Sequence, residues 1–204
     1  LETAIALRPT HLSHYQLTLE PGTVFYHRPP PLPDADAAWD MQEHSQARLA
    51  SVGYGQYEVS AYAQSGFRCE HNLNYWRFGD YLGLGAGAHG KLTRAAAGEI
   101  VRTFRTKQPR SYLASPAALR RERIEPVNAH DLPFEFMLNA LRLYEPIDPA
   151  TFESRTGRSR STVWPLIQQA AAKGLLEIDA AGRWTPTSLG RRFLNDLQAM
   201  FLDD

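Results

Sequence analysis

The side chains best suited to chemistry gather in residues 69–90, which read CEHNLNYWRFGDYLGLGAGAHG. This stretch holds an imidazole at His71 and an amide at Asn72, followed by the flat, amphipathic rings of Tyr75 and Trp76. Imidazole is a common metal ligand, and such rings stack on planar aromatic ligands that have polar edges. We therefore expect a binding site here rather than a piece of apolar core.

His71 alone has three interpretations, namely a metal ligand, a catalytic acid or a polar loop residue, and the last is the commonest for a lone histidine. Its neighbours favour the first. If a turn of extended chain carries Asn72, Tyr75 and Trp76 past it, the imidazole can ligate haem iron while the rings stack on the porphyrin. Cys69 is a second candidate axial ligand, although a small buried thiol is the commoner role for such a cysteine.

Glycines dominate the end of this stretch, at Gly83, Gly85, Gly87 and Gly90. Their density does not suit an ordinary helix or strand and implies close approach of the backbone. The spacing G-x-G-x-G-x-x-G departs from the dinucleotide-binding fingerprint, whose acidic residue about twenty positions on is also missing. Two interpretations stay open: a loop in which Gly83, Gly85, Gly87 and His89 line a ligand cavity, or a tight structural bend.

Composition limits the function classes. The chain has 204 residues, with 22 basic and 22 acidic side chains, so there is no global basic field to attract nucleic acid. No apolar run of about eighteen residues predicts a membrane-spanning helix, and no signal peptide is visible, so we expect a cytoplasmic protein. The single cysteine, Cys69, excludes an internal disulfide and a cysteine-only iron–sulfur site within this chain. Because the chain opens on Leu1, in what reads as the tail of a helix, we expect it to be a piece of a longer protein.

The first half predicts a strand, a helix and a strand in order. Residues 11–20 alternate and are rich in β-formers, a proline-rich loop follows over residues 23–33, and a helix is expected over about 37–52. Residues 56–63 give the second strand. This order is typical of a βαβ unit in a parallel sheet. The predicted inner face of the helix consists of Ala38, Met41, Ser45, Leu49 and Val52.

After the central stretch we expect a strand over residues 98–106 and a short helix or turn over residues 109–113. Residues 115–130 are charged and irregular, and we interpret them as a linker. Asp131 then caps a helix over residues 133–143. The predicted inner face of that helix consists of Phe134, Met137, Leu138 and Leu141.

The remaining residues predict a winged-helix-like module. One helix begins at Ala150 and breaks at Gly157, a second covers residues 161–173, a hairpin turns at residues 180–182, and a closing helix covers residues 189–202. The predicted domains are residues 1–114, the linker 115–130 and residues 131–204.

Other functional motifs are weak or missing. Residues 155–160 (RTGRSR) stand where a DNA-binding winged helix places basic contacts, but the wing tip over residues 179–182 is acidic. No Ser/His/Asp triad spacing, HExxH or P-loop is present. The usual hydrolase and phosphate-binding classes are therefore not expected.

Four blocks together resemble the radical S-adenosylmethionine haem chaperones of the HemW type, relatives of oxygen-independent coproporphyrinogen III oxidase. The blocks are SHYQLTLEPGT over 13–23, YEVSAYA over 57–63, HNLNYW over 71–76 and GDYLGLGAGAHG over 79–90. The third block is similar to the HNxxYW motif assigned to haem binding in the chaperones, whereas the oxidases carry an H-R-N-x-Q-G-Y type of sequence there. The resemblance therefore favours a chaperone over an oxidase.

The resemblance implies an α/β fold, made of the C-terminal strands of a partial (β/α) TIM-like barrel followed by a winged-helix-like α+β domain. It implies that His71 ligates haem iron and that Asn72, Tyr75 and Trp76 complete the motif. By the same analogy, Gln16 and Thr18 line the S-adenosylmethionine site.

The family's 4Fe–4S cluster needs a CxxxCxxC motif, which is missing here. The resemblance therefore assigns the cluster and S-adenosylmethionine to the full-length protein, and we do not expect this chain to be catalytic alone.

The implied function is to bind haem and to transfer it to respiratory or other haem-requiring proteins. One alternative is an oxygen-independent coproporphyrinogen III oxidase, and a weaker one is a winged-helix DNA-binding module. The expected partners are haem and haem-acceptor proteins, without nucleic acid or a transmembrane segment. Homodimerisation and peripheral membrane association through a partner are left open.

Overall fold

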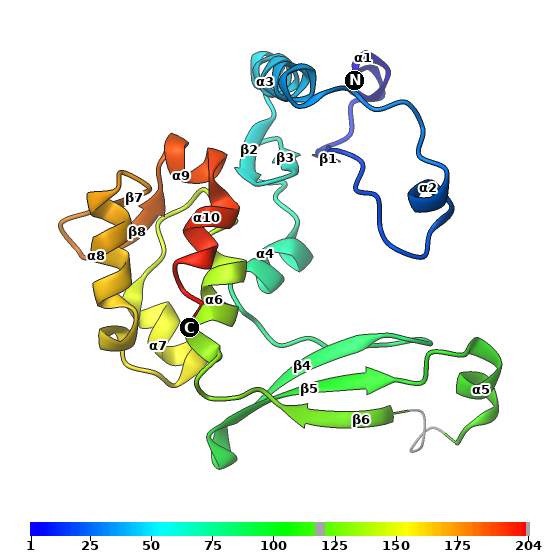
Figure 1. Ribbon diagram of the computed structural model, residues 1–204, viewed down its shortest axis with the longest axis vertical. Helices are drawn as coiled ribbons and strands as arrows, with labels where there is room; N and C mark the ends of the chain where they lie inside the picture. Colours follow the sequence, from blue (N-terminus) through cyan, green and yellow to red (C-terminus); the bar gives the residue numbers. More distant parts are fainter. Residues whose placement is uncertain (117–120, 203–204) are drawn as a thin grey trace. The chain divides into compact units, whose positions relative to one another are not determined.

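The computed structural model describes residues 1–116 and 121–202. The chain divides after Cys69 into two compact units, which we describe separately as unit 1 (residues 1–69) and unit 2 (residues 70–204). Both combine helices with small antiparallel sheets (Figure 1). The chain is thus a mixed α/β protein, as the sequence predicts.

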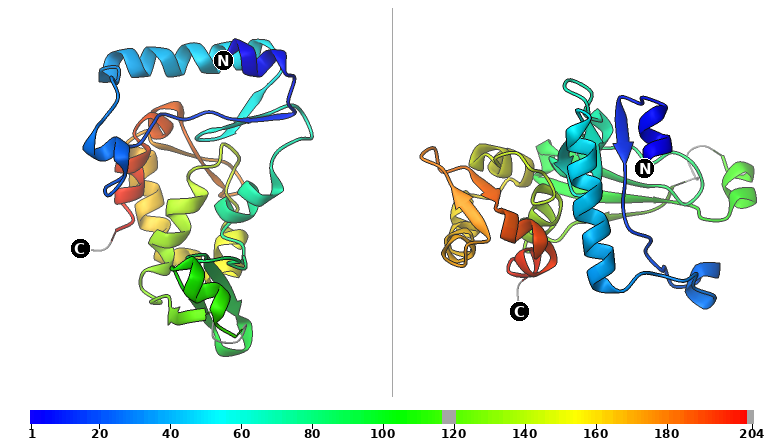
Figure 2. Two further views of the ribbon diagram at one scale, coloured as in Figure 1. Left: turned by 90° about the vertical axis from the view of Figure 1, so that its right-hand side faces the viewer. Right: turned by 90° about the horizontal axis from the view of Figure 1, so that it is seen from above.

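Unit 1 places one long helix beside a three-stranded sheet with the order β1-β3-β2. Helix α3, the longest of this unit, stands out in Figure 2. Leu49 of α3 forms a small buried cluster with Tyr54, which follows the helix, and Tyr62 of β3. The elements are α1 Glu2–Ala6, β1 His11–Ser13, α2 Val24–His27, α3 Ala35–Ser51, β2 Gly55–Glu58 and β3 Ala61–Ala63.

The predicted parallel βαβ unit is wrong in its pairing. Residues 56–63 do not form one strand, because the chain turns at Val59 and Ser60 and pairs β2 with β3 as an antiparallel hairpin. Strand β1 pairs antiparallel with β3, so β1 and β2 run in the same direction with β3 between them. Since β3 has three residues, β1 ends at Ser13, and residues 14–20 have no regular structure instead of continuing the predicted strand.

Helix α3 confirms the predicted helix. The Asp34 carboxylate accepts a hydrogen bond from the Ala37 N–H at 2.8 Å, and the chain leaves the helix at Gly53, whose φ is +89°. Of the predicted inner face, Ser45 and Leu49 are buried, whereas Met41 is 61% exposed.

Unit 2 combines an antiparallel sheet of order β4-β5-β6 with a helical module that carries the hairpin β7-β8 (Figure 1). The predicted strand over 98–106 is confirmed by β5, and the short helix over 109–113 by α5. The elements up to the helical module are α4 Glu70–Trp76, β4 His89–Arg94, η1 Ala95–Ala97, β5 Glu99–Arg105, α5 Pro109–Ala114 and β6 Arg121–Pro126. The helical module contains α6 Leu132–Ala140, α7 Pro149–Thr156, η3 Arg160–Thr162, α8 Trp164–Ala172, β7 Leu176–Ile178, β8 Trp184–Pro186, α9 Ser188–Arg192 and α10 Leu194–Ala199.

The predicted linker is partly a strand. Within residues 115–130, β6 pairs with β5 from Val101↔Pro126 to Arg105↔Arg121, and residues 117–120 lie outside the described residues. The charged residues of this segment concealed a strand, in which Arg123 and Glu125 are exposed. The domain boundaries drawn from the sequence stay a prediction, but the compact unit that holds the C-terminal module already begins at residue 70.

The winged-helix-like order is present as predicted. Helix α7 ends at Gly157 with φ +67°, α8 is followed by Gly174 with φ +73°, and β7 and β8 form the hairpin. Ile147 pairs with Trp184 and adds a third segment to this hairpin. The predicted closing helix is broken into α9 and α10 at Phe193.

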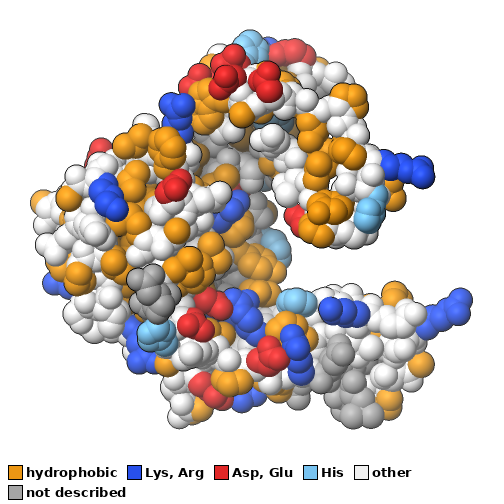
Figure 3. Space-filling view, in the orientation of Figure 1, with side chains coloured by type: hydrophobic (Ala, Val, Ile, Leu, Met, Phe, Trp, Pro, Cys, Tyr) orange, Lys and Arg blue, Asp and Glu red, His pale blue; other side chains and the backbone are white. Residues whose placement is uncertain are grey.

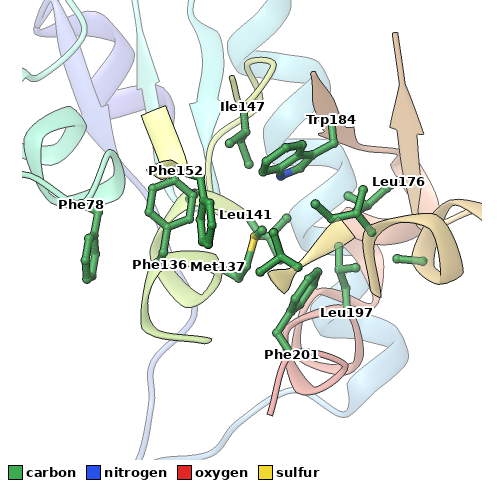
Figure 4. Packing of buried hydrophobic residues seen from close by; sticks show 14 of the residues in the cluster. Phe78, Phe136, Met137, Leu141, Ile147, Phe152, Leu176, Trp184, Leu197 and Phe201 are labelled. Atoms are coloured by element: carbon green, nitrogen blue, oxygen red, sulfur yellow. The ribbon is translucent and has the colours of Figure 1, made fainter. Parts of the chain in front are cut away.

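Among the described residues, Phe78 and fifteen buried residues between Ile100 and Phe201 form the main core of unit 2. Figure 4 shows Phe78, Phe136 and Phe152 as a row of rings, with centroids 5.7 Å and 5.2 Å apart in turn. On α6 the buried side is Leu132, Phe136, Met137 and Ala140, so the predicted face was rotated: Leu138 is 42% exposed. Phe78 thereby connects the segment after α4 to the helical module.

Candidate functional site

The HNLNYW segment lies in helix α4, Glu70–Trp76, so the prediction of a turn of extended chain is wrong. Its residues contain no glycine or proline, and Leu73 is buried. Helical spacing places His71 and Tyr75 on one side of α4, since residues four apart lie one above the other. Their ring centroids are 4.8 Å apart in an edge-on arrangement.

The end of α4 is fixed by an unusual backbone at Phe78, whose φ is +56°. The Phe78 N–H donates to the Tyr75 carbonyl and the Gly79 N–H to the Asn74 carbonyl, which satisfies carbonyls at the end of the helix. A Cβ on Gly79 would lie 2.0 Å from the Asn74 Oδ1 atom, so only glycine fits there. The chain therefore turns sharply after the motif, toward residues 80 and 81.

Tyr81 extends the pair of rings into a row of three. Its ring centroid lies 4.3 Å from that of Tyr75, and its backbone pairs with Lys91 of β4. Burial raises the pKa of the Tyr81 hydroxyl, and the positive charge of Arg102 offsets only part of this effect. At the other end of the row His71 is exposed, so its imidazole is accessible to a ligand from solvent.

Lys91 and Asp80 hold this row against β4. The Lys91 ammonium donates to the Phe78 carbonyl at 2.9 Å and to the Asp80 carboxylate at 3.2 Å, and lies 4.1 Å from the centroid of the Phe78 ring. Burial lowers the pKa of Lys91, with the Asp80 charge opposing it. Burial acts to raise the pKa of Asp80, but hydrogen bonds from the Thr93 N–H, the Thr93 hydroxyl and Lys91 bring it below its ordinary value.

Trp76 faces the helical module rather than the side of α4 that carries His71 and Tyr75. Its indole lines a small cavity of about 90 Å³ together with Phe136, and the Arg142 guanidinium lies 4.3 Å from its ring centroid. The indole Nε1 is buried and, among the described residues, finds no hydrogen-bond partner. Asn72, four residues before Trp76 on α4, is partly buried. The motif thus has a ligand-accessible side, with His71 and Tyr75, and a packing side, with Trp76.

The glycine run packs against β4. A Cβ on Gly83 would lie 2.3 Å from the His89 carbonyl oxygen, and one on Gly90 would lie 2.6 Å from Thr103 Oγ1. Gly85 and Gly87 have φ values of +102° and +71°. These contacts account for the glycines as a tight bend, and the alternative of a cavity-lining loop stays a prediction.

In unit 1, Gln16 lines a cavity of about 420 Å³ between residues 14–17, residues 32–33 and α3, whereas Thr18 is not among its lining residues. Cys69 has a free, partly buried thiol, and its backbone N–H donates to the Tyr57 hydroxyl at 3.3 Å. Within the ranges that the structure describes, no three His, Cys, Asp or Glu side chains are grouped so that they could hold a metal ion. A haem site would therefore depend on a single imidazole rather than on a preformed metal cluster.

Sequence reasoning missed Tyr81, Lys91 and Arg102. Tyr81 and Lys91 come together through strand pairing, and Arg102 joins them from the next strand. No periodicity links these positions in the sequence. Only the unusual burial of a lysine in a polar strand would have pointed to them, and burial is not visible before the fold is known.

Residues 127–193 match the family described as "HemN C-terminal domain". The whole chain is 47% identical to the heme chaperone HemW of Haemophilus influenzae, and 99% of it aligns at 48% identity with HemW of Escherichia coli. In both cases the chain spans about half the length of the relative, at 52%.

Among solved structures, the chain is similar to that of coproporphyrinogen III oxidase (HemN) from Escherichia coli, described as a radical SAM enzyme. The TM-score is 0.71 at 16% identity, and the match covers 98% of this chain and 49% of that one. This likeness concerns the fold alone. The chain therefore carries a HemN C-terminal domain over residues 127–193, and over its whole length it is similar to about half of the heme chaperone HemW.

Proposed function

We propose that the full gene product binds haem through His71 of α4 and passes it to haem-requiring acceptor proteins. The observation that carries this proposal is an exposed imidazole on a helix, braced by the Tyr75 and Tyr81 rings, in a chain 47% identical to a protein named heme chaperone. Neutral imidazole ligates haem iron through one ring nitrogen, and its accessibility to solvent leaves that nitrogen free to approach the metal.

The exposure of His71 suits delivery better than storage. Pockets that retain a cofactor bury most of its surface, which slows release. A haem bound at the surface of α4 keeps one side open, so an acceptor protein can approach it while the iron is still ligated. The edge-on contact with Tyr75 restricts the orientation of the imidazole without enclosing it.

The radical chemistry of the family belongs to the rest of the gene product in this proposal. A 4Fe–4S cluster needs several cysteine ligands, and this chain has only Cys69, so its residues do not fit the cluster. Gln16, beside the cavity in unit 1, is the proposed contact to S-adenosylmethionine from this chain. In the described parts of the chain, no helix is long and apolar enough to cross a membrane. We assign the protein to the cytoplasm, with its acceptors as the link to any membrane.

Haem titration of the full gene product tests the role of His71. We expect a Soret band that saturates with added haem in the wild-type protein and is lost or strongly weakened in His71→Ala. The matched control is His130→Ala, because His130 is also an exposed histidine of unit 2 but lies outside α4. Equal Soret bands in the wild-type protein and His71→Ala would remove His71 as the iron ligand.

Transfer is measured by mixing the haem-loaded protein with an apo haem protein that has a distinct absorption spectrum. We expect haem to move to the acceptor faster from the loaded protein than from free haem at the same concentration. No difference from free haem would contradict a delivery function even if binding through His71 held.

A further inference from the structure

A second aromatic and basic cluster lies on the sheet β4-β5-β6, away from α4. His89, Phe104 and Arg123 are directly opposite one another on the three strands, in the register His89↔Phe104 and Phe104↔Arg123. The His89 and Phe104 ring centroids are 4.7 Å apart, and the Arg123 guanidinium lies 4.0 Å from the centroid of the Phe104 ring. Residues directly opposite in antiparallel strands share a face, so these three side chains form one patch.

The patch is open to solvent. His89 and Arg123 are exposed and Phe104 is partly buried. In Figure 3, histidine, basic and hydrophobic side chains occur side by side on the surface of this sheet. A partly buried phenylalanine ring with a guanidinium over it and an imidazole beside it offers an apolar surface with a positive edge.

The same face of the sheet leads back to the row of rings at α4. Lys91 and Arg102 are directly opposite each other, in the cross-strand pair that lies two residues along from His89 and Phe104. Because side chains two residues apart in a strand point to the same side, Arg102 and Phe104 are neighbours on one face. The Arg102 charge acts on the Tyr81 hydroxyl, and the ring centroids of Tyr81 and Tyr75 are 4.3 Å apart. This face of the sheet therefore leads from the patch toward the row of rings that includes His71.

We propose that the His89–Phe104–Arg123 patch extends the haem-binding surface, with Phe104 contacting the macrocycle and Arg123 pairing with a haem propionate. This inference rests on the proposed haem-binding function. Haem carries two carboxylates at one edge, and a guanidinium is the side chain best matched to a carboxylate. Arg102 is already paired with Glu135, whereas Arg123 forms an ion pair with Glu125 in which the two side chains are 57% and 49% exposed. An ion pair so exposed is weak, so a propionate can compete for Arg123.

Because Arg123 is exposed, a substitution there can test the propionate contact without unfolding the protein. Its replacement should leave folding nearly unchanged, because exposed ion pairs contribute little to stability. Arg94→Gln is a matched control, since Arg94 forms a similar exposed ion pair with Glu99 on the same sheet, and the alternation along β4 turns it away from the face that carries His89.

The experiment titrates the full gene product with haem and with haem dimethyl ester, whose propionates are uncharged. We expect Arg123→Gln to bind haem about three- to tenfold more weakly than the wild type, with the Soret maximum unchanged. The dimethyl ester should bind equally to both proteins, and Arg94→Gln should match the wild type with either ligand. Phe104→Leu, checked by its melting temperature, should weaken both ligands.

The outcomes separate this inference from the function on which it rests. Equal haem affinity of Arg123→Gln and the wild type, or an equal loss for haem and its ester, overturns the propionate contact while leaving His71 as the ligand. Unchanged affinity of a folded Phe104→Leu overturns the macrocycle contact. A wild-type protein without a saturable Soret band overturns both this inference and the proposed function.

Discussion

Among single residues, Asp80 connects the segment after α4 to β4 through its carboxylate. Its carboxylate accepts hydrogen bonds from the Thr93 N–H at 2.8 Å, the Thr93 hydroxyl at 2.8 Å and the Lys91 ammonium at 3.2 Å. These bonds tie the segment after α4 to β4. They also hold the pKa of Asp80 below its ordinary value of 3.8, although burial opposes them.

Asp80→Asn should therefore destabilise the protein by about 1–3 kcal/mol at neutral pH, because the amide keeps the shape but loses the charge-assisted bonds. A lowered folded-state pKa means that the carboxylate stabilises the fold fully above its unfolded pKa. This contribution is lost as the pH falls through the lowered folded pKa. Urea unfolding of both proteins from pH 6 to pH 3 should show the stability difference shrinking below about pH 4. A difference that stays constant down to pH 3 would contradict this role.

For single residues, the sequence identified candidate ligands by their chemical type, but it did not identify the residues that they contact. His71 and Tyr75 could be named because an imidazole and a phenol ring in one motif suggest a ligand. Tyr81, Lys91 and Arg102 could not, since their contacts depend on the pairing of Tyr81 with Lys91 and on the register of β4 with β5. Trp76 was predicted as a ligand contact, and only the fold shows its indole packed beside Phe136 and Arg142.

Helix α4 places some residues of the HNLNYW motif in the core and leaves others exposed to solvent. A seven-residue helix is marginal by itself, so α4 depends on the packing of its buried side. Leu73 is buried and Trp76 lines the cavity with Phe136, which leaves His71 exposed on another side. The expectation of extended chain failed because tertiary packing, rather than local periodicity, stabilises so short a helix.

Trp76→Ala should lower the free energy of unfolding by about 2–4 kcal/mol, because it removes the indole that packs α4 against the helical module. His71→Ala should change it by less than about 0.5 kcal/mol, since the imidazole is exposed. Chemical denaturation of the two variants beside the wild type gives both values. Similar losses in the two variants would contradict the division of α4 into a packing side and a ligand side.

The bend at Gly83, before β4, should also be sensitive to substitution. Gly83→Ala should destabilise unit 2 by more than about 2 kcal/mol, because the new Cβ would lie 2.3 Å from the His89 backbone oxygen. Gly55→Ala is the control, since its Cβ would meet only the Ala63 oxygen at 3.8 Å. Thermal unfolding compares the two, and a Gly83→Ala protein as stable as the control would show that the bend relaxes freely.

At the scale of the whole molecule, the two units differ strongly in their cores. Among the described residues, unit 2 buries a cluster of sixteen, whereas Leu49, Tyr54 and Tyr62 form a small cluster in unit 1. The sequence predicted the order of the winged-helix-like elements because glycines at 157 and 174 and the turn at 180–182 mark their ends. It missed the antiparallel sheet of unit 1, because strand order depends on contacts distant in sequence that alternation does not encode.

Residues 70–204 expressed alone should therefore fold cooperatively, whereas residues 1–69 alone should not, because burial of apolar surface is the main favourable term in folding. Circular dichroism during thermal unfolding distinguishes the two cases. A broad, non-cooperative transition for residues 70–204 would show that unit 2 needs further sequence to fold.

Haem-dependent stabilisation of the full gene product tests the central claim most directly, because a ligand that binds only the folded state raises the melting temperature. If haem is ligated by His71 on the exposed side of α4, excess haem should raise the melting temperature of the wild-type protein and leave that of His71→Ala unchanged. An equal rise in the two proteins would place the haem site elsewhere and contradict the account.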